Sequence, residues 1–238
     1  KFAALARGGG AVQGAYEGTF TEGTLTGDFR AIILENGEYW VVYGQEVNNI
    51  LLADGFIQGR GASSGGSFAS TDSRDFGFLP PVAGALNATY VPNTSFQGAF
   101  TPAVGPRANF NGSMIADAQF NYHAPAMLTD IARTWQLTSL AGGTSTVVVA
   151  ADGTFSGVVQ GDPGQQCTYS GQFLPRPSGK NVFDASVHFG GATCPVTLSM
   201  SGVGVVVRPT PTSTQLLVGF VNADRSIGDM LFSTIVPK

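Results

Sequence analysis

Apolar and polar residues alternate with a period of two along most of the chain. Between positions 182 and 189, Phe183, Ala185, Val187 and Phe189 fall on one face, and Val182 with three polar side chains falls on the other. The same alternation, with Ser and Thr as the polar partners, runs through 194–201. It indicates half-buried β-strands, because successive side chains of a strand point to opposite faces of the sheet.

Turn signals separate these strands at short intervals. Asn36 and Gly37 lie between two apolar runs, as do Asp152 and Gly153, and such pairs favour type I′ hairpin turns, which need positive φ at both central residues. The further expected strands cover 15–21, 28–34, 38–43, 50–60, 66–70, 85–91, 95–101, 108–114, 117–122, 134–140, 145–150, 154–160, 167–174, 203–208, 215–222 and 229–235. A short segment that begins with proline, 125–132, is the one helical candidate.

The strand count predicts an all-β protein of two antiparallel units, each an up-and-down barrel or a sandwich of roughly eight strands. The expected divisions are a flexible N-terminal segment at 1–13, a first β unit at 14–123, a short helical connector at 124–133 and a second β unit at 134–238. The two halves share negligible sequence identity, so this division rests on the strand count.

Composition favours a protein that works outside the cytosol. Charged residues make up 12% of the 238 positions, about half of the usual share. A net charge of −4 and only three lysines (Lys1, Lys180 and Lys238) exclude a basic surface for nucleic acid. No apolar run approaches the ~18 residues that a membrane-spanning helix needs. The opening residues are typical of a mature end from which a signal peptide has been removed.

The two cysteines add to this interpretation. Cys167 shares a strand face with Tyr169, and Cys194 shares one with Val196, so both sulfurs are expected on the apolar side of strands in the same half. A cross-strand disulfide would imply an oxidising compartment and would contribute roughly 3–4 kcal/mol by restricting the unfolded chain. The alternative is two unrelated buried thiols. Two sulfurs without convergent histidines do not form a metal site.

Catalytic signals are weak. His123 and His188 fall on the polar faces of strands in different halves, which is typical of surface histidines. The G-x-S-x-G pattern at 61–65 lies in a Gly/Ser turn with no helix after it, whereas a hydrolase elbow needs a following helix. We therefore expect no enzyme, no catalytic residue, no metal and no cofactor.

Charged and aromatic residues of three expected loops are the candidate partner-binding residues. They are Asp72, Arg74 and Asp75 in the first loop, Phe78 in the next, and Asp224 and Arg225 in a loop near the end of the chain. Arg and exposed aromatic side chains usually dominate interface energies. Surface ion pairs or a weak calcium site are the alternatives. The 17 phenylalanines are expected to fill the core, or else to line a ligand cavity inside a barrel.

Several runs carry a family resemblance: Gly-Phe-Ile-Gln-Gly-Arg at 55–60, Gly-Ser-Phe-Ala-Ser at 66–70 followed by Asp75 and Phe76, and the cysteine-bearing runs 167–171 and 182–194. The chain resembles uncharacterised Gly-rich β-barrel surface lipoproteins of Gram-negative bacteria. More distantly, it is similar to the barrel lobes of transferrin-binding-protein-like lipoproteins. This resemblance implies an extracytoplasmic place, at the outer-membrane surface or secreted. Such lipoproteins have an acylated N-terminal cysteine, which is not found here, so the anchor is either trimmed off or absent.

Three functions follow as hypotheses. The first is a non-enzymatic cell-envelope or surface binding protein that recognises a protein or envelope component through loops. The second is a structural surface protein that self-associates, because strand donation to a neighbour is open to such a chain. The third is a carrier of a small apolar ligand inside a barrel, which an apolar cavity of several hundred Å³ would favour.

Overall fold

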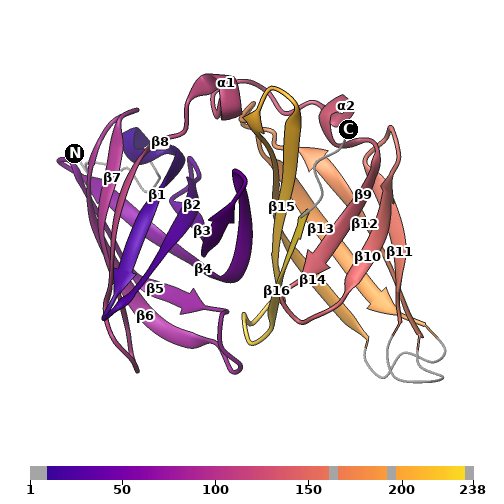
Figure 1. Ribbon diagram of the computed structural model, residues 1–238, viewed down its shortest axis with the longest axis horizontal. Helices are drawn as coiled ribbons and strands as arrows, with labels where there is room; N and C mark the ends of the chain where they lie inside the picture. The colour runs from indigo at the N-terminus through magenta and orange to yellow at the C-terminus, as the bar shows by residue number, and fades with distance from the viewer. Residues whose placement is uncertain (1–9, 161–165, 192–196, 234–238) are drawn as a thin grey trace, which may run out of the picture. The chain divides into compact units, whose positions relative to one another are not determined.

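The chain forms two closed antiparallel β-barrels (Figure 1). The structure is a computed structural model that describes residues 10–160, 166–191 and 197–233. In each barrel every strand pairs with the next one along the chain, and the last strand pairs with the first. The expectation of an all-β protein with two units of about eight strands is therefore confirmed, and both units are barrels.

The first barrel is closed by β1 and β8, with Tyr16 opposite Met114 and Phe20 opposite Phe110. Its strands are β1 (Gly14–Glu22), β2 (Leu25–Ile33), β3 (Glu38–Val47), β4 (Ile50–Ser64), β5 (Ser67–Asp75), β6 (Val82–Val91), β7 (Ser95–Pro102) and β8 (Ala108–Met114). A single 3-10 turn, η1 (Gly10–Val12), precedes them.

The second barrel is closed by β9 and β16, with Leu231 opposite Ser139. Its strands are β9 (Thr134–Ser139), β10 (Thr144–Val149), β11 (Thr154–Gln160), β12 (Gln166–Pro175), β13 (Phe183–Gly190), β14 (Leu198–Thr210), β15 (Ser213–Val221) and β16 (Gly228–Ser233). Residues 198–201 of the expected strand 194–201 and the whole of the expected strand 203–208 belong to the single strand β14.

Two short helices, α1 (Asp117–Phe120) and α2 (Leu128–Ile131), lie between the barrels in the sequence. The expected strand at 117–122 is wrong. Phe120 and Tyr122 are two positions apart and both buried, so they imitate the period of a strand although the backbone there is helical and then irregular. The main division between the two compact units falls between Ala116 and Asp117. In the described part of the chain, no helix is long and apolar enough to cross a membrane.

The interior of the second barrel is a contiguous hydrophobic core. Phe183, Ala185 and Val187 point into it, as their alternation predicts, while Ser186 and His188, on the other face of the same strand, are exposed. Aromatic side chains from neighbouring strands pack there, for example Phe155 against Phe173 with ring centroids 4.8 Å apart.

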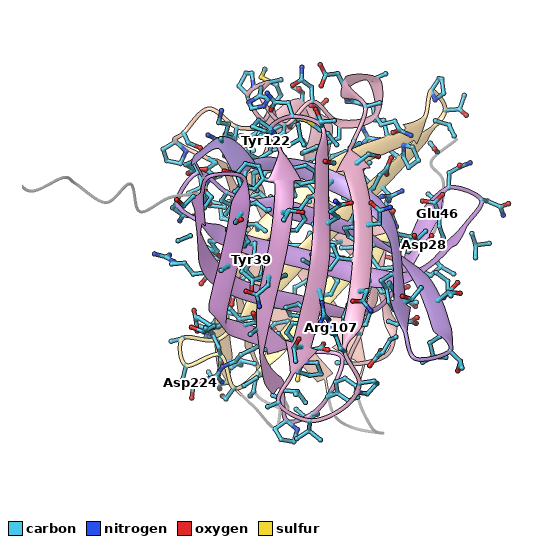
Figure 2. The ribbon with its side chains drawn as sticks, turned by 90° about the vertical axis from the view of Figure 1, so that its left-hand side faces the viewer. Asp28, Tyr39, Glu46, Arg107, Tyr122 and Asp224 are labelled. Atoms are coloured by element: carbon cyan, nitrogen blue, oxygen red, sulfur yellow. The ribbon has the colours of Figure 1, made fainter. Side chains whose placement is uncertain are left out.

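The first barrel also has an inner core, formed by alternate residues of its strands. Its members include Tyr16, Tyr39, Phe68 and Phe96, which are almost completely buried. Tyr39 lies within this barrel (Figure 2), and its hydroxyl is hydrogen-bonded to Ser70 and Ser73 of β5. Buried tyrosine hydroxyls need such partners.

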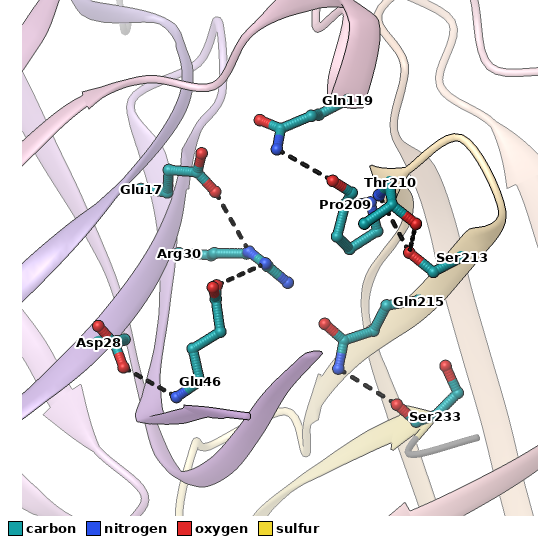
Figure 3. Close-up of polar contacts among 10 residues, drawn as sticks. All are labelled: Glu17, Asp28, Arg30, Glu46, Gln119, Pro209, Thr210, Ser213, Gln215 and Ser233. Carbon is teal, nitrogen blue, oxygen red and sulfur yellow. Dashed lines mark hydrogen bonds and ion pairs between the residues drawn. The ribbon is translucent and has the colours of Figure 1, made fainter. Parts of the chain in front are cut away.

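The opposite face of the same strands places its charges outside the barrel. Arg30 of β2 lies between Phe29 and Ala31, which face the core, so its own side chain points outward. It forms ion pairs with Glu17 of β1 at 3.5 Å and with Glu46 of β3 at 3.0 Å (Figure 3). The guanidinium therefore links three neighbouring strands on the outer face of the barrel.

Candidate functional site

The core leaves one part of the first barrel hollow. A cavity of about 370 Å³ lies there, within the size range of small-molecule sites, ~300–1,000 Å³. Its wall is largely aromatic: Phe20, Phe29, Tyr43, Phe96, Phe100 and Phe110 all line it. Aliphatic residues such as Ile57 and Leu86 complete the wall.

Strand register explains why the aromatic rings converge. Phe20 and Phe110 are direct partners across β1 and β8, so both side chains point to the same face. The ring of Phe110 meets Phe29 edge-on at 5.7 Å and stacks on Phe96 at 5.2 Å. Offset and edge-on contacts at these distances are favourable for aromatic pairs.

Glycines on the neighbouring strands make room for these rings. A Cβ at Gly27 would lie 2.5 Å from the ring of Phe20, and a Cβ at Gly84 would lie 2.5 Å from the ring of Phe100. Both rings therefore lie directly over strand backbone, which leaves the space in front of them free for a ligand.

The cavity opens at one end of the barrel. Because neighbouring strands run antiparallel, the connections after β1, β3, β5 and β7 share that end. The connection after β5 contributes Phe78 to the lining, and the connection after β7 contributes Val104. These side chains are 58% and 79% exposed, so apolar residues that contact the cavity also contact solvent. The mouth is hydrophobic.

Polar groups in the lining centre on Asp75 and Tyr43. The Tyr43 hydroxyl donates a hydrogen bond of 2.6 Å to Oδ1 of Asp75, and the backbone N–H of Gly77 donates one of 2.9 Å to the same oxygen. Burial raises the pKa of Asp75, and the two hydrogen bonds act in the opposite direction. Burial, with the nearby carboxylate of Asp75, also raises the pKa of Tyr43.

A second carboxylate, that of Glu22, lines the cavity at the end of β1 and is half-buried. Among the described residues that form the lining there is no Lys, Arg or His. The charge that faces the cavity is therefore entirely negative.

The structure brings together two of the residues that the sequence singled out. Asp75 and Phe78 both line the cavity. The expectation that Asp72, Arg74 and Asp75 lie in a loop is wrong, because all three belong to β5, where Asp72 is exposed and Arg74 half-buried. A register shift between Ser70 and Ser73 interrupts the period of two in this strand. The alternation of the sequence therefore did not predict that the strand continues beyond residue 70.

Asp224 and Arg225 lie elsewhere, in the turn between β15 and β16 of the second barrel. Asp224 is exposed and accepts hydrogen bonds from the backbone N–H and the hydroxyl of Ser226. These bonds lower the pKa of the Asp224 carboxyl. They are typical of an Asx turn, which accounts for the aspartate at this position.

Sequence reasoning missed Glu22 and Tyr43. One signal for Glu22 was present: it follows Phe20 by two positions and therefore shares its inward face. An acidic residue on an apolar strand face is unusual enough to mark a site. Tyr43 had no comparable signal, because a tyrosine on an inward face is as common in a filled core as beside a cavity.

The remaining candidates for chemistry lie on the surface or outside the described residues. His188 and Ser199 are hydrogen-bonded at 2.9 Å on exposed strand positions. The segment 61–65 runs from β4 into a turn that leads to β5, which is not a strand-to-helix elbow. Among the described residues, no three His, Cys, Asp or Glu side chains lie together in a group that could hold a metal ion.

Only one cysteine of the predicted disulfide, Cys167, lies among the described residues. Cys167 lies on β12, two positions from the buried Tyr169, and is half-buried. Cys194 lies outside the described residues. The pairing of the two cysteines therefore stays a prediction.

Comparisons with known proteins add little. No protein-family model matches the chain, and no curated protein matches it significantly. Among solved structures it is similar to a protein of unknown function from the DUF3598 family of Nostoc punctiforme, with 11% identity and a TM-score of 0.28. The alignment covers 97% of this chain and 98% of that chain. So weak a likeness carries no argument about function, and none of the comparisons supports a lipoprotein identity.

Proposed function

We propose that the first barrel binds a small, mainly apolar molecule and that the protein is a carrier or receptor for it. The observation behind this proposal is the aromatic cavity of about 370 Å³ with its hydrophobic mouth at Phe78 and Val104. This is the third of the hypotheses that the sequence left open, and an apolar cavity of this size is the feature that favours it.

The energetics suit a ligand that binds reversibly. Burying about 250 Å² of apolar ligand surface is worth about 6 kcal/mol at ~25 cal/mol per Å². Some of that is offset by the entropy cost of association. A dissociation constant in the micromolar range, about −8 kcal/mol, therefore needs a polar contact in addition to the apolar wall. Asp75 and Tyr43 are placed to make one.

The setting in the cell is a second part of the proposal. A low share of charged residues, scarce lysine and the expected pairing of Cys167 with Cys194 support an extracytoplasmic protein. A lipoprotein at the bacterial outer membrane surface, or a secreted protein, would fit that composition. Two other functions remain predictions: recognition of a protein or envelope component through loops, and self-association. Size-exclusion chromatography of the purified chain tests self-association.

Ligand binding is tested with a neutral fluorescent probe, N-phenyl-1-naphthylamine, titrated into the purified protein. We expect saturable fluorescence enhancement with one site per chain. Ala108→Phe places a ring in the cavity, because Ala108 lines it, and should abolish the signal. Asn109→Phe is the matched control, since the neighbouring Asn109 is exposed and is not part of the lining. If the two variants bind the probe equally, the cavity is not the site.

A further inference from the structure

We propose that the natural ligand is an apolar amine, a hydrophobic body with one protonated nitrogen. This inference rests on the proposed function of the cavity and specifies the class of ligand. It starts from the sign of the charge in the cavity: Asp75 and Glu22 are its charged lining residues, and both are acidic.

Nearby basic residues do not neutralise these carboxylates. Arg30 of β2 points outward and pairs with Glu17 and Glu46 (Figure 3). Arg107 lies on the exposed connection after β7 and is not part of the lining (Figure 2). A ligand with a carboxylate would thus be buried beside like charges, with no basic side chain among the described lining residues to pair with, which is strongly unfavourable.

Asp75 has the geometry to receive an ammonium group. Both of its hydrogen bonds, from Tyr43 and from the backbone of Gly77, are accepted by Oδ1. Among the described residues, no hydrogen bond reaches Oδ2. The first two bonds fix the orientation of the carboxylate, and Oδ2 is left to accept a proton from the ligand. Such charge-assisted hydrogen bonds are about twice as strong as neutral ones.

The electrostatic surroundings of Tyr43 also favour a positively charged ligand group. The pKa of its hydroxyl is raised by burial and then by the charges of Asp75, Glu22 and Asp54. Three carboxylates therefore act on this one position, where a cation would be stabilised. The aromatic wall adds to this, because ring faces attract a cation within about 6 Å of the ring centroid.

The test compares three probes that share a naphthalene body: 2-(1-naphthyl)ethylamine, 2-(1-naphthyl)ethanol and 1-naphthylacetic acid. Each is measured by displacement of N-phenyl-1-naphthylamine from the purified chain at neutral pH. We expect the amine to bind about tenfold more tightly than the alcohol, which corresponds to one charge-assisted contact, and the acid to bind most weakly.

Variants separate the contribution of charge from that of shape. Asp75→Asn should reduce the affinity for the amine about tenfold, to that of the alcohol, and leave the alcohol unaffected. The amide oxygen can still accept the bonds from Tyr43 and Gly77, so the fold is expected to persist. Asp72→Asn, on the same strand but exposed and outside the lining, should change none of the three affinities. Should Asp75→Asn fail to fold, Glu22→Gln at the half-buried end of β1 takes its place. Its expected loss for the amine is smaller, because the contact with Asp75 remains, and the alcohol should again be unaffected.

The results distinguish this inference from the proposed function. If the alcohol or the acid binds as tightly as the amine, the ligand is not an amine, while the cavity remains a binding site. If the neutral probe binds but none of the three displaces it, the amine inference also fails. If even the neutral probe does not bind, both the amine inference and the proposed function fail.

Discussion

Asp75 shows how strongly one residue depends on its surroundings. In the sequence it is one of several scattered acids, yet in the fold it is 7% exposed, faces an aromatic cavity and shares a hydrogen bond with Tyr43. Burial raises its pKa despite two hydrogen bonds. The folded protein therefore holds the Asp75 proton more tightly than the unfolded chain does.

The first prediction follows from that direction of shift. Because the folded pKa of Asp75 lies above the unfolded value, its contribution to stability is fully present below about pH 4 and is lost as pH rises through the folded pKa. The amide side chain in the Asp75→Asn variant cannot titrate, so the variant does not lose this stability. The difference in free energy of unfolding between variant and parent should therefore shift in favour of the variant as pH rises from 4 to 7. Urea unfolding followed by the fluorescence of Trp40, with Trp135 replaced by Phe in both proteins, measures this difference. A difference that stays constant over this pH range would contradict the prediction.

The second prediction concerns Phe78 at the mouth of the cavity. Its side chain is 58% exposed and lines the cavity, so Phe78→Ala should change stability by no more than about 0.5 kcal/mol. The affinity for the neutral probe should fall about three- to tenfold, since part of the apolar wall is removed. Leu79→Ala is the control, because Leu79 is 88% exposed and does not line the cavity. Equal losses in both variants would argue against a role for Phe78 in binding.

At the scale of elements, strand pairing decides which residues meet. The register of β6 with β7 sets Gly98 opposite Ala88, and the backbones approach so closely there that a side chain does not fit. A Cβ at Gly98 would lie 2.1 Å from the carbonyl oxygen of Asn87 and 2.6 Å from the Cα of Ala88. The contact is with backbone, which cannot move aside without breaking the ladder.

The third prediction tests that contact. Gly98→Ala should destabilise the protein by about 1–3 kcal/mol, the usual cost of overpacking. Gly190→Ala on β13 is the control, since among the described residues a Cβ there would meet the side chain of His188 alone, at 3.5 Å, which is an ordinary contact. Thermal unfolding of both variants should show a clear drop in midpoint for the first and a small change for the second. The reverse order would mean that the register of β6 and β7 is wrong.

The fourth prediction concerns the strand that bears Cys167. Tyr169 and Phe173 of β12 are both buried, as the alternation predicts. Cys167 lies two positions before Tyr169 and therefore shares its apolar face of the strand. We predict that it is bonded to Cys194. Thiol titration in denaturant without reductant should find no free thiol in protein from its native compartment. Two free thiols would refute the bond and remove one support for an extracytoplasmic location.

At the scale of the whole molecule, both barrels are built from eight strands around a hydrophobic core. In the second barrel, Trp135, Phe155 and Phe183 belong to that core. In the first barrel, the core is accompanied by a cavity that the rings of Phe20, Phe96 and Phe110 line. How much of a small barrel is filled therefore depends on the size of the inward side chains as well as on the number of strands.

The fifth prediction follows from binding to the folded state. A ligand that binds the native protein but not the unfolded chain should stabilise it by about 2.7 kcal/mol at a free concentration near 100 Kd. We expect N-phenyl-1-naphthylamine to raise the thermal midpoint of the parent protein in proportion to the logarithm of its concentration. Ala108→Phe should show no such increase. A rise of the same size in this variant would indicate binding outside the cavity.

The alternation of apolar and polar residues, with Asn-Gly and Asp-Gly turns, was sufficient to predict two antiparallel β units, while the choice between barrel and sandwich was left to the structure. Strand period and turn chemistry are local properties, so they can be read without knowing what a strand packs against. They failed at Phe120 and Tyr122, two buried aromatic residues whose spacing is that of a strand although the backbone there is helical and then irregular. They also failed in β5, where the bulge after Ser70 disrupts the period.

The candidate site depended on tertiary structure because its residues come from distant parts of the chain. Glu22, Tyr43 and Asp75 belong to β1, β3 and β5, and only barrel closure and strand register place them around one space. The sequence by itself determined a protein of antiparallel strands in two units with few charges. Whether the inward phenylalanines fill a barrel or line a cavity was decided by the tertiary structure, because a cavity depends on how much volume all the strands together leave unfilled.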